Sequence, residues 1–146
     1  MRHITKSPKE TQKLGHFLLN KISFSGQKNA VVISLTGELG AGKTTFVQGL
    51  AKILGIKTKI KSPTFTLMKK YKIPGLKNSK FMYHLDCYRL QNHKDLLSLG
   101  IEDVLKDKEN ILLIEWPERI KKILSKKLID IKIDHIDKNT RKITIK

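Results

Sequence analysis

The sequence predicts an α/β fold with three layers, α/β/α, around a mostly parallel central sheet that has an antiparallel edge. Residues 30–36 and 111–114 are nearly continuous apolar runs, typical of strands buried on both faces of a parallel sheet. A glycine-rich turn and a helical pattern follow the first run, and this order opens many α/β proteins. Because 146 residues are one domain's worth, we expect a single domain over residues 1–146.

Two helices are predicted in the first third of the chain. The first begins at Pro8, because Ser7 can cap it, proline suits the first helical position and Glu10 completes a capping box. Apolar residues then recur at the spacing of one helix face as far as Ile22. The second helix spans 43–54, where apolar residues again lie on one side, and a glycine follows it.

Strands dominate the rest of the predicted chain, with short helices between them. In order, the pattern predicts a strand around 66–72, a strand over 81–86, short helices over 94–106, the strand over 111–114 and a short helix after Pro117. Isoleucine then alternates with charged residues over 128–134, and Ile143 and Ile145 alternate near the end. This alternation indicates an antiparallel strand pair that closes one edge of the sheet.

The chain is strongly basic, with 30 Lys and Arg against 13 Asp and Glu, a net charge of +17. Such a charge suggests an anionic partner, although 26 lysines against 4 arginines and 3 alanines also indicate codon bias. Residues 1–80 carry +14 and residues 81–146 carry +3. Nine lysines and no acid occupy 52–80. We interpret the charge as a field around an anionic-ligand face, with lysine enrichment superimposed.

Several classes of protein are excluded or disfavoured by composition. At 39% hydrophobic residues the chain is too apolar for a disordered polycation. No apolar run approaches the roughly 18 residues of a membrane span, and the first residues are too polar for a secretory signal. One cysteine, Cys87, excludes an internal disulfide and fits a reducing compartment. We therefore expect a cytoplasmic protein with no membrane partner.

Residues 37–44, GELGAGKT, match the phosphate-loop pattern G-x-x-x-x-G-K-[ST]. The glycines let the backbone curl so that successive N–H groups point at phosphate oxygens. The helix that follows adds its positive N-terminal end. Lys43 can reach the β- and γ-phosphates, and the Thr44 hydroxyl can ligate Mg²⁺. The pattern therefore predicts ATP and Mg²⁺ as ligands.

Two carboxylates are candidates for the metal and water site that such a loop needs. Asp86 ends one predicted strand, and Glu115 follows the apolar run 111–114. Phosphate-loop enzymes place a carboxylate at the end of a neighbouring strand. Lys43 and Thr44 alone cannot complete the oxygen shell of Mg²⁺. The alternative for each acid is a solvated carboxylate or an ion pair with a lysine. We take Lys43, Asp86 and Glu115 as the catalytic candidates.

Four motifs in this order and spacing are specific to one family. They are 37–45 (GELGAGKTT), 62–66 (SPTFT), 84–89 (HLDCYR) and 114–118 (IEWPE). Over nearly its whole length the chain resembles the TsaE (YjeE) family, the small ATPases of bacterial tRNA threonylcarbamoyladenosine synthesis. The resemblance implies a P-loop NTPase fold and slow ATP hydrolysis. It implies TsaB and TsaD as partners, and tRNA reached through their complex. The modified adenosine would lie next to the anticodon of tRNAs that read A-starting codons.

The resemblance also implies roles for single residues. Thr44 and Glu115 would hold Mg²⁺. Asp86 would lie close by, as a further metal candidate or as the group that orients or activates water. Thr45 would cover the phosphates. Trp116 would sit beside the nucleotide, and a structural core tryptophan is an equal alternative.

Further nucleotide-binding candidates come from the loop and from both ends of the chain. They are Thr11, Glu38, Leu39, Gly40, Ala41, Gly42, Lys43 and Arg141. Thr11 would lie near the adenine and Arg141 near the base. Residues 62–65 would form a mobile segment that senses the γ-phosphate. Cys87 replaces a residue that is usually apolar, and we interpret it as a buried hydrophobe rather than a nucleophile.

Two other functions use the same features. A small-molecule kinase also has a phosphate loop, but it usually needs an arginine-rich lid. The arginines here, Arg2, Arg89, Arg119 and Arg141, form no cluster in sequence, and Arg89 can equally serve an ion pair. A nucleic-acid-binding module would explain the charge, but no helix-turn-helix, RNP or zinc signature is present.

Overall fold

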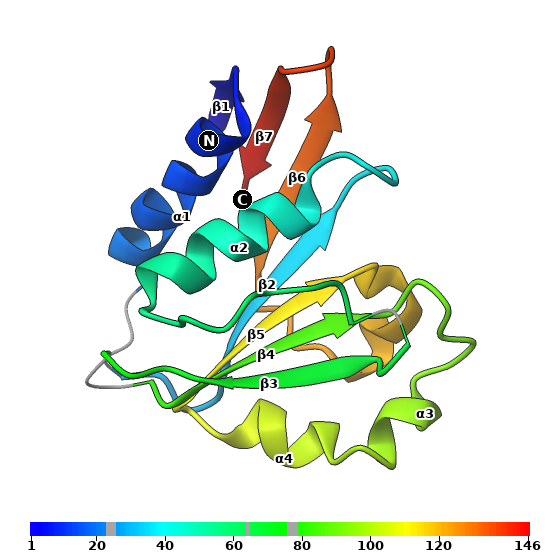
Figure 1. Ribbon diagram of the computed structural model, residues 1–146. Coiled ribbons are helices and arrows are strands. Elements are labelled where there is room, and N and C mark those ends of the chain that lie inside the picture. The colour runs from blue at the N-terminus through cyan, green and yellow to red at the C-terminus, as the bar shows by residue number, and fades with distance from the viewer. Residues whose placement is uncertain (23–25, 64, 76–78) are drawn as a thin grey trace.

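The described residues form a seven-stranded sheet in the order β1-β7-β6-β2-β5-β4-β3 (Figure 1). The computed structural model describes residues 1–22, 26–63, 65–75 and 79–146. The strands are β1 (Arg2–Thr5), β2 (Val31–Thr36), β3 (Met68–Lys72), β4 (Phe81–Asp86), β5 (Asn110–Glu115), β6 (Ile129–His135) and β7 (Arg141–Ile145). The helices are α1 (Pro8–Lys21), α2 (Lys43–Ile53), α3 (Lys94–Leu97), α4 (Ile101–Lys106) and the 3₁₀ helix η1 (Pro117–Ile123).

The middle of the sheet is parallel and its edges are antiparallel. β4 pairs with β5, β5 with β2, and β2 with β6, all in parallel. β6 pairs antiparallel with β7, which confirms the predicted antiparallel edge. A second antiparallel edge exists, because β3 pairs antiparallel with β4. The sequence does not predict β1, since four residues are too few to show a period of two and the strand depends on pairing with β7.

Helices α1 and α2 cover one face of the sheet and cross closely (Figure 1). The predicted start of α1 is confirmed, since the Ser7 side chain accepts a hydrogen bond from the Glu10 backbone N–H at 3.2 Å. Gly49 lies at the crossing, where a Cβ atom would come within 2.4 Å of Gln12 Cα. Because only glycine permits this approach, Gly49 lets the backbones of α1 and α2 come into contact.

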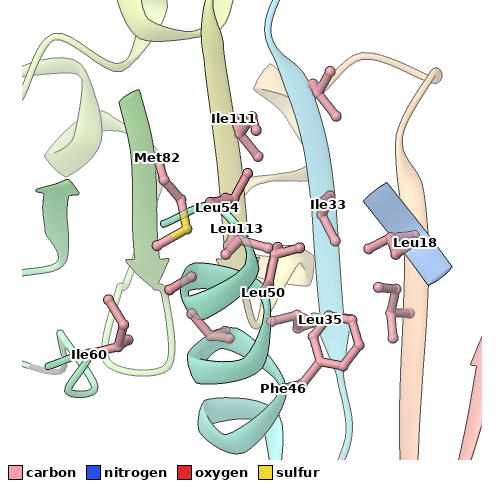
Figure 2. Packing of buried hydrophobic residues seen from close by; sticks show 14 of the residues in the cluster. Leu18, Ile33, Leu35, Phe46, Leu50, Leu54, Ile60, Met82, Ile111 and Leu113 are labelled. Atoms are coloured by element: carbon pink, nitrogen blue, oxygen red, sulfur yellow. The ribbon is translucent and has the colours of Figure 1, made fainter. Parts of the chain in front are cut away.

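The main core lies between these two helices and the sheet. Figure 2 shows Phe46 and Leu50 of α2 beside the sheet residues Ile33, Leu35 and Leu113. All five side chains are fully buried. Truncating a leucine in such a site to alanine costs about 2–5 kcal/mol, so this packing holds α2 firmly against the sheet.

A second core lies on the other face of the sheet, under α3, α4 and η1, and completes three layers. It joins Leu96, Ile101 and Ile120 of these helices to Leu112 of β5. Cys87 belongs to this cluster, and burial raises the pKa of its thiol to about 12. The interpretation of Cys87 as a buried hydrophobe is therefore confirmed. Within the described ranges, no helix is long and apolar enough to cross a membrane.

Candidate functional site

The turn from β2 into α2 is a tight loop shaped by three glycines. Gly37, Gly40 and Gly42 have φ angles of 145°, 76° and 104°, in the region that other residues rarely adopt. A Cβ atom on Gly37 would also lie 2.3 Å from the carbonyl oxygen of Ile133 on β6. The loop therefore needs glycine both for its conformation and for its contact with the sheet.

Lys43 opens α2 and folds back into the loop. Its side chain is almost completely buried, and Nζ donates hydrogen bonds to the carbonyls of Gly37 at 2.8 Å and Glu38 at 2.9 Å. Nζ also lies 5.0 Å from the centre of the Trp116 ring. An ammonium group has three hydrogens, so one donor is left for a ligand in the loop.

Asp86 and Glu115 lie directly opposite each other, at the carboxyl ends of β4 and β5. The parallel register pairs the two residues, and the Cys87 N–H donates to the Glu115 carbonyl at 3.0 Å. Both side chains are nearly buried, at 7% and 4% exposure. Ligands of open α/β sheets bind outside the carboxyl ends of the strands, which is where these acids lie.

The two carboxylates are held by different hydrogen-bond partners. Glu115 Oε1 lies 2.8 Å from Nε2 of the buried His84. Asp86 Oδ2 accepts from the Ser62 hydroxyl at 3.1 Å, and Oδ1 accepts from the Tyr88 N–H at 3.0 Å. The two acids therefore point into the same space from differently built supports.

A cleft of about 510 Å³ joins the loop to the carboxylates. One side, here called the loop wall, consists of Leu39, Gly40, Gly42, Lys43, Thr44 and Thr45. The other side, the carboxylate wall, consists of Ser62, Asp86, Tyr88, Arg89, Glu115 and Trp116. The structure thus brings most of the sequence-predicted candidates into one cavity, although they come from four separate segments.

Trp116 lies at the boundary between the second core and the cleft. It packs against the second core and also lines the cleft, beside the Tyr88 ring at 5.0 Å between centroids. Its backbone has φ 58° and ψ 55°, a left-handed conformation that costs a residue other than glycine about 1–3 kcal/mol. The chain turns sharply here, and this turn aims the ring at Lys43.

Thr11, Glu38, Ala41 and Arg141 lie outside this cleft. Thr11 and Arg141 line a second cavity of about 40 Å³ beside Gly42, and the Thr11 hydroxyl is hydrogen-bonded to that of Thr5 at 2.8 Å. Arg141 Nε donates to the Ala41 carbonyl at 2.9 Å, and Nη1 donates to the carbonyls of residues 137 and 140. Glu38 lines another cavity, which lies between the loop, β6 and Trp116.

The structure describes only part of the segment 62–65, which the family resemblance implies to be mobile. Thr64 lies outside the described residues. Ser62 contacts Asp86, whereas the Phe65 side chain is 88% exposed with the Arg89 guanidinium 5.0 Å above its ring. Among the described residues Arg89 forms no ion pair. Its guanidinium lies over the Phe65 ring, and the residue lines the cleft.

The oxygen donors in the cleft suit magnesium. The Thr44 hydroxyl and the Asp86 and Glu115 carboxylates are hard oxygen ligands, which Mg²⁺ prefers. In the part of the chain that is described, no three His, Cys, Asp or Glu residues gather as a metal cluster. Nucleotide-bound Mg²⁺ usually takes one or two carboxylates and completes its shell with phosphate and water, so the pair fits this ion.

Some contacts of the site are missing from the sequence prediction. The pairing of His84 with Glu115 and the bond from Arg141 to the loop join residues 31 and 100 positions apart. His84 lies two residues before Asp86, and this period of two on a strand is the signal that could have placed it on the same face.

A mixed sheet with a parallel centre, whose strand β2 runs through a glycine-rich loop into α2, and acids at the ends of β5 and β4 on one side of β2, define a P-loop NTPase-like α/β protein. The chain belongs to the TsaE family. The family model described as "Threonylcarbamoyl adenosine biosynthesis protein TsaE" matches residues 5–143. Members of this family take part in tRNA threonylcarbamoyladenosine biosynthesis, and the resemblance noted from the four motifs is confirmed.

Curated relatives and a solved structure agree with this assignment. The TsaE protein of Rickettsia conorii is 38% identical over 144 residues, covering 98% of this chain and 76% of the relative. The TsaE protein of Bacillus subtilis is 34% identical over 140 residues, covering 96% and 81%. The crystal structure of Bacillus subtilis YdiB superposes with a TM-score of 0.68 at 29% identity, covering 99% of this chain and 83% of that one.

Proposed function

We propose that this protein binds ATP with Mg²⁺ in the cleft and hydrolyses it slowly, as the ATPase component of tRNA threonylcarbamoyladenosine synthesis. The observation that carries the proposal is the cleft itself, in which a phosphate loop faces two carboxylates. A loop without acids could hold phosphates only. Acids at the ends of neighbouring strands are what phosphoryl transfer requires in addition.

The loop wall would bind the triphosphate. Its backbone N–H groups and the N-terminus of α2 attract negative charge, and Lys43 lies in the hollow with a hydrogen to donate. Thr45 lines the same wall and would cover the phosphates. Charge neutralisation by a buried lysine is stronger than in water, because the surrounding protein is less polarisable.

The carboxylate wall would serve the metal ion and the attacking water. Thr44 and Glu115 would hold Mg²⁺, which when bound neutralises charge on the phosphate oxygens. Asp86 lies in the same cleft with its own hydrogen-bond donors, Ser62 and the Tyr88 N–H. This support leaves Asp86 positioned to orient a water and to accept its proton as the new bond forms.

The partners in this proposal are TsaB and TsaD, in the cytoplasm, with tRNA reached through their complex. The protein would couple ATP turnover to the cycle of the transferase and would not itself modify the adenosine next to the anticodon. A pull-down with TsaB and TsaD tests this half of the proposal. Failure to bind with ATP, with ADP and without nucleotide would remove it.

Lys43→Ala tests the ATP half, with Lys52→Ala on the exposed side of the same helix as the matched control. We expect Lys43→Ala to abolish Mg²⁺-dependent ATP binding by calorimetry and the release of inorganic phosphate, while Lys52→Ala keeps both. Wild-type binding and turnover in Lys43→Ala would sink the proposal. A phosphorylated small molecule in place of free phosphate would instead identify a kinase.

A further inference from the structure

The side chain of Glu115 is held by a histidine inside the protein. His84 is fully buried on β4, on the face that α2 covers, and its Nε2 lies 2.8 Å from Glu115 Oε1. Among the described residues His84 is the one hydrogen-bond partner of the Glu115 side chain. Glu115 lines the cleft and His84 does not, so the histidine lies behind the carboxylate as seen from a bound ligand.

Hydrogen-bond chemistry indicates which group of the pair donates and why the residue is a histidine. An ionised carboxylate only accepts hydrogen bonds, so Nε2 carries the hydrogen and donates it to Oε1. The other ring nitrogen, Nδ1, is buried without a partner among the described residues. An apolar side chain would fill the site without leaving a buried polar atom unpaired. Packing alone therefore does not account for a histidine here, whereas its bond to Glu115 does.

We infer that His84 is a positioning residue for Glu115. By fixing Oε1 through Nε2–H, it sets the rotamer of the carboxylate and leaves Oε2 available to the cleft for the metal ion. The inference rests on the proposed function, because that function makes Glu115 a ligand of the metal ion. Hydrogen-bond partners behind a metal ligand hold it in the binding orientation, and their loss typically weakens metal affinity about 10–100-fold.

The experiment compares His84→Leu with His84→Gln in the full chain. Leucine removes the donor and keeps an apolar fill, whereas the glutamine amide can donate from near the position of Nε2. Calorimetry measures ATP affinity during a Mg²⁺ titration and in EDTA. We expect His84→Leu to raise the Mg²⁺ concentration needed for half of the affinity gain about 10–100-fold. His84→Gln should restore most of the loss, and ATP affinity in EDTA should not change.

Three further variants make the result specific. Met82→Leu, at a fully buried position two residues earlier on the same face, controls for repacking. His84→Leu should add little to the loss of Mg²⁺ dependence in Glu115→Gln, because the histidine acts on the metal ion only through the Glu115 carboxylate, which the glutamine variant no longer has. If His84→Leu does not fold, His84→Asn gives the comparison with a polar side chain, since its shorter amide does not reach the position of Nε2.

The inference is overturned if the donor-free variant keeps the wild-type Mg²⁺ dependence, or if it loses ATP affinity equally in EDTA. Additive loss in the double variant would overturn it as well. A wild-type protein whose ATP affinity ignores Mg²⁺ is a different failure. That result would remove the proposed function itself, and the role of His84 with it.

Discussion

The two walls of the cleft are built in opposite ways. The loop wall comes from one unbroken stretch and is shaped by backbone, with glycines in left-handed conformations and Lys43 bonded to its own loop. The carboxylate wall comes from three segments and is shaped by side-chain hydrogen bonds to Asp86 and Glu115. One wall lies in the basic half of the chain, and the acids come from the other half.

This difference divides the work of the site. The loop wall tolerates an exposed side chain such as Leu39, because its form depends on the glycines. The carboxylate wall depends on strand register, since a slip of one residue between β4 and β5 would turn a carboxylate to the other face. We therefore expect the loop wall to govern nucleotide affinity and the carboxylate wall to govern turnover.

Asp86→Asn gives the largest effect and tests that division directly. Asparagine keeps the size and one acceptor but cannot take a proton from water. Phosphate release should fall about 100–10,000-fold, while ATP affinity by calorimetry stays within a few-fold of wild type. Glu109→Gln, just before the other end of β5 and ion-paired with Lys80, is the matched control and should keep normal turnover. Equal losses of binding and turnover in Asp86→Asn would break the comparison.

Gly37→Ala tests how far the loop wall depends on the close contact between Gly37 and β6. The added Cβ would meet the Ile133 carbonyl at 2.3 Å in a conformation with φ 145°, so something must shift. We expect a loss of about 1–3 kcal/mol of unfolding free energy in urea, together with weaker ATP binding. Gly40→Ala has a φ of 76° but open space around its Cβ, so it should lose less. Equal losses in the two variants would show that the contact with β6 does not matter.

The same difference decides how much the sequence could predict. The loop wall is contiguous, so its eight-residue pattern contains nearly all of its chemistry. The strand ends at Asp86 and Glu115 could also be predicted, because apolar runs mark buried strands. The bonds behind them could not, since His84 to Glu115 and Arg141 to Ala41 exist only after distant strands come together. The strand β1 escapes prediction for the same reason, as its partner lies at the far end of the chain.

Arg141→Met tests whether the loop wall depends on a contact from outside its own segment. The guanidinium reaches from β7 to the Ala41 carbonyl at 2.9 Å, so its removal should loosen the loop. We expect ATP and inorganic triphosphate to bind about tenfold more weakly, a cost typical of one charged hydrogen bond. Lys142→Met, the next residue on β7 and paired with Asp134, should bind both normally. A loss confined to ATP would instead reveal a contact between Arg141 and the base.

The smallest effect on the cleft is expected from the lysines that lead into the carboxylate wall. Lys57, Lys59 and Lys61 are exposed on the segment just before Ser62, in the stretch 52–80 that holds no acid. Replacing all three with glutamine should leave stability and ATP affinity unchanged. Assembly with tRNA-loaded TsaB and TsaD should weaken, and the slope of log affinity against log salt should fall by about one for each tRNA phosphate that a lysine no longer neutralises.

This last comparison decides whether the positive charge belongs to the site or surrounds it. Exposed charges outside the cleft are screened within about 8 Å at physiological salt, so we expect them to act on a large anion that approaches the surface more than on a nucleotide inside. Equal weakening of ATP binding and of assembly would mean that the lysines act on the nucleotide and form an outer part of the carboxylate wall. Tight, sequence-selective tRNA binding by the isolated chain would instead favour a dedicated nucleic-acid-binding module. An unchanged assembly at every salt concentration would leave codon bias as the origin of these lysines.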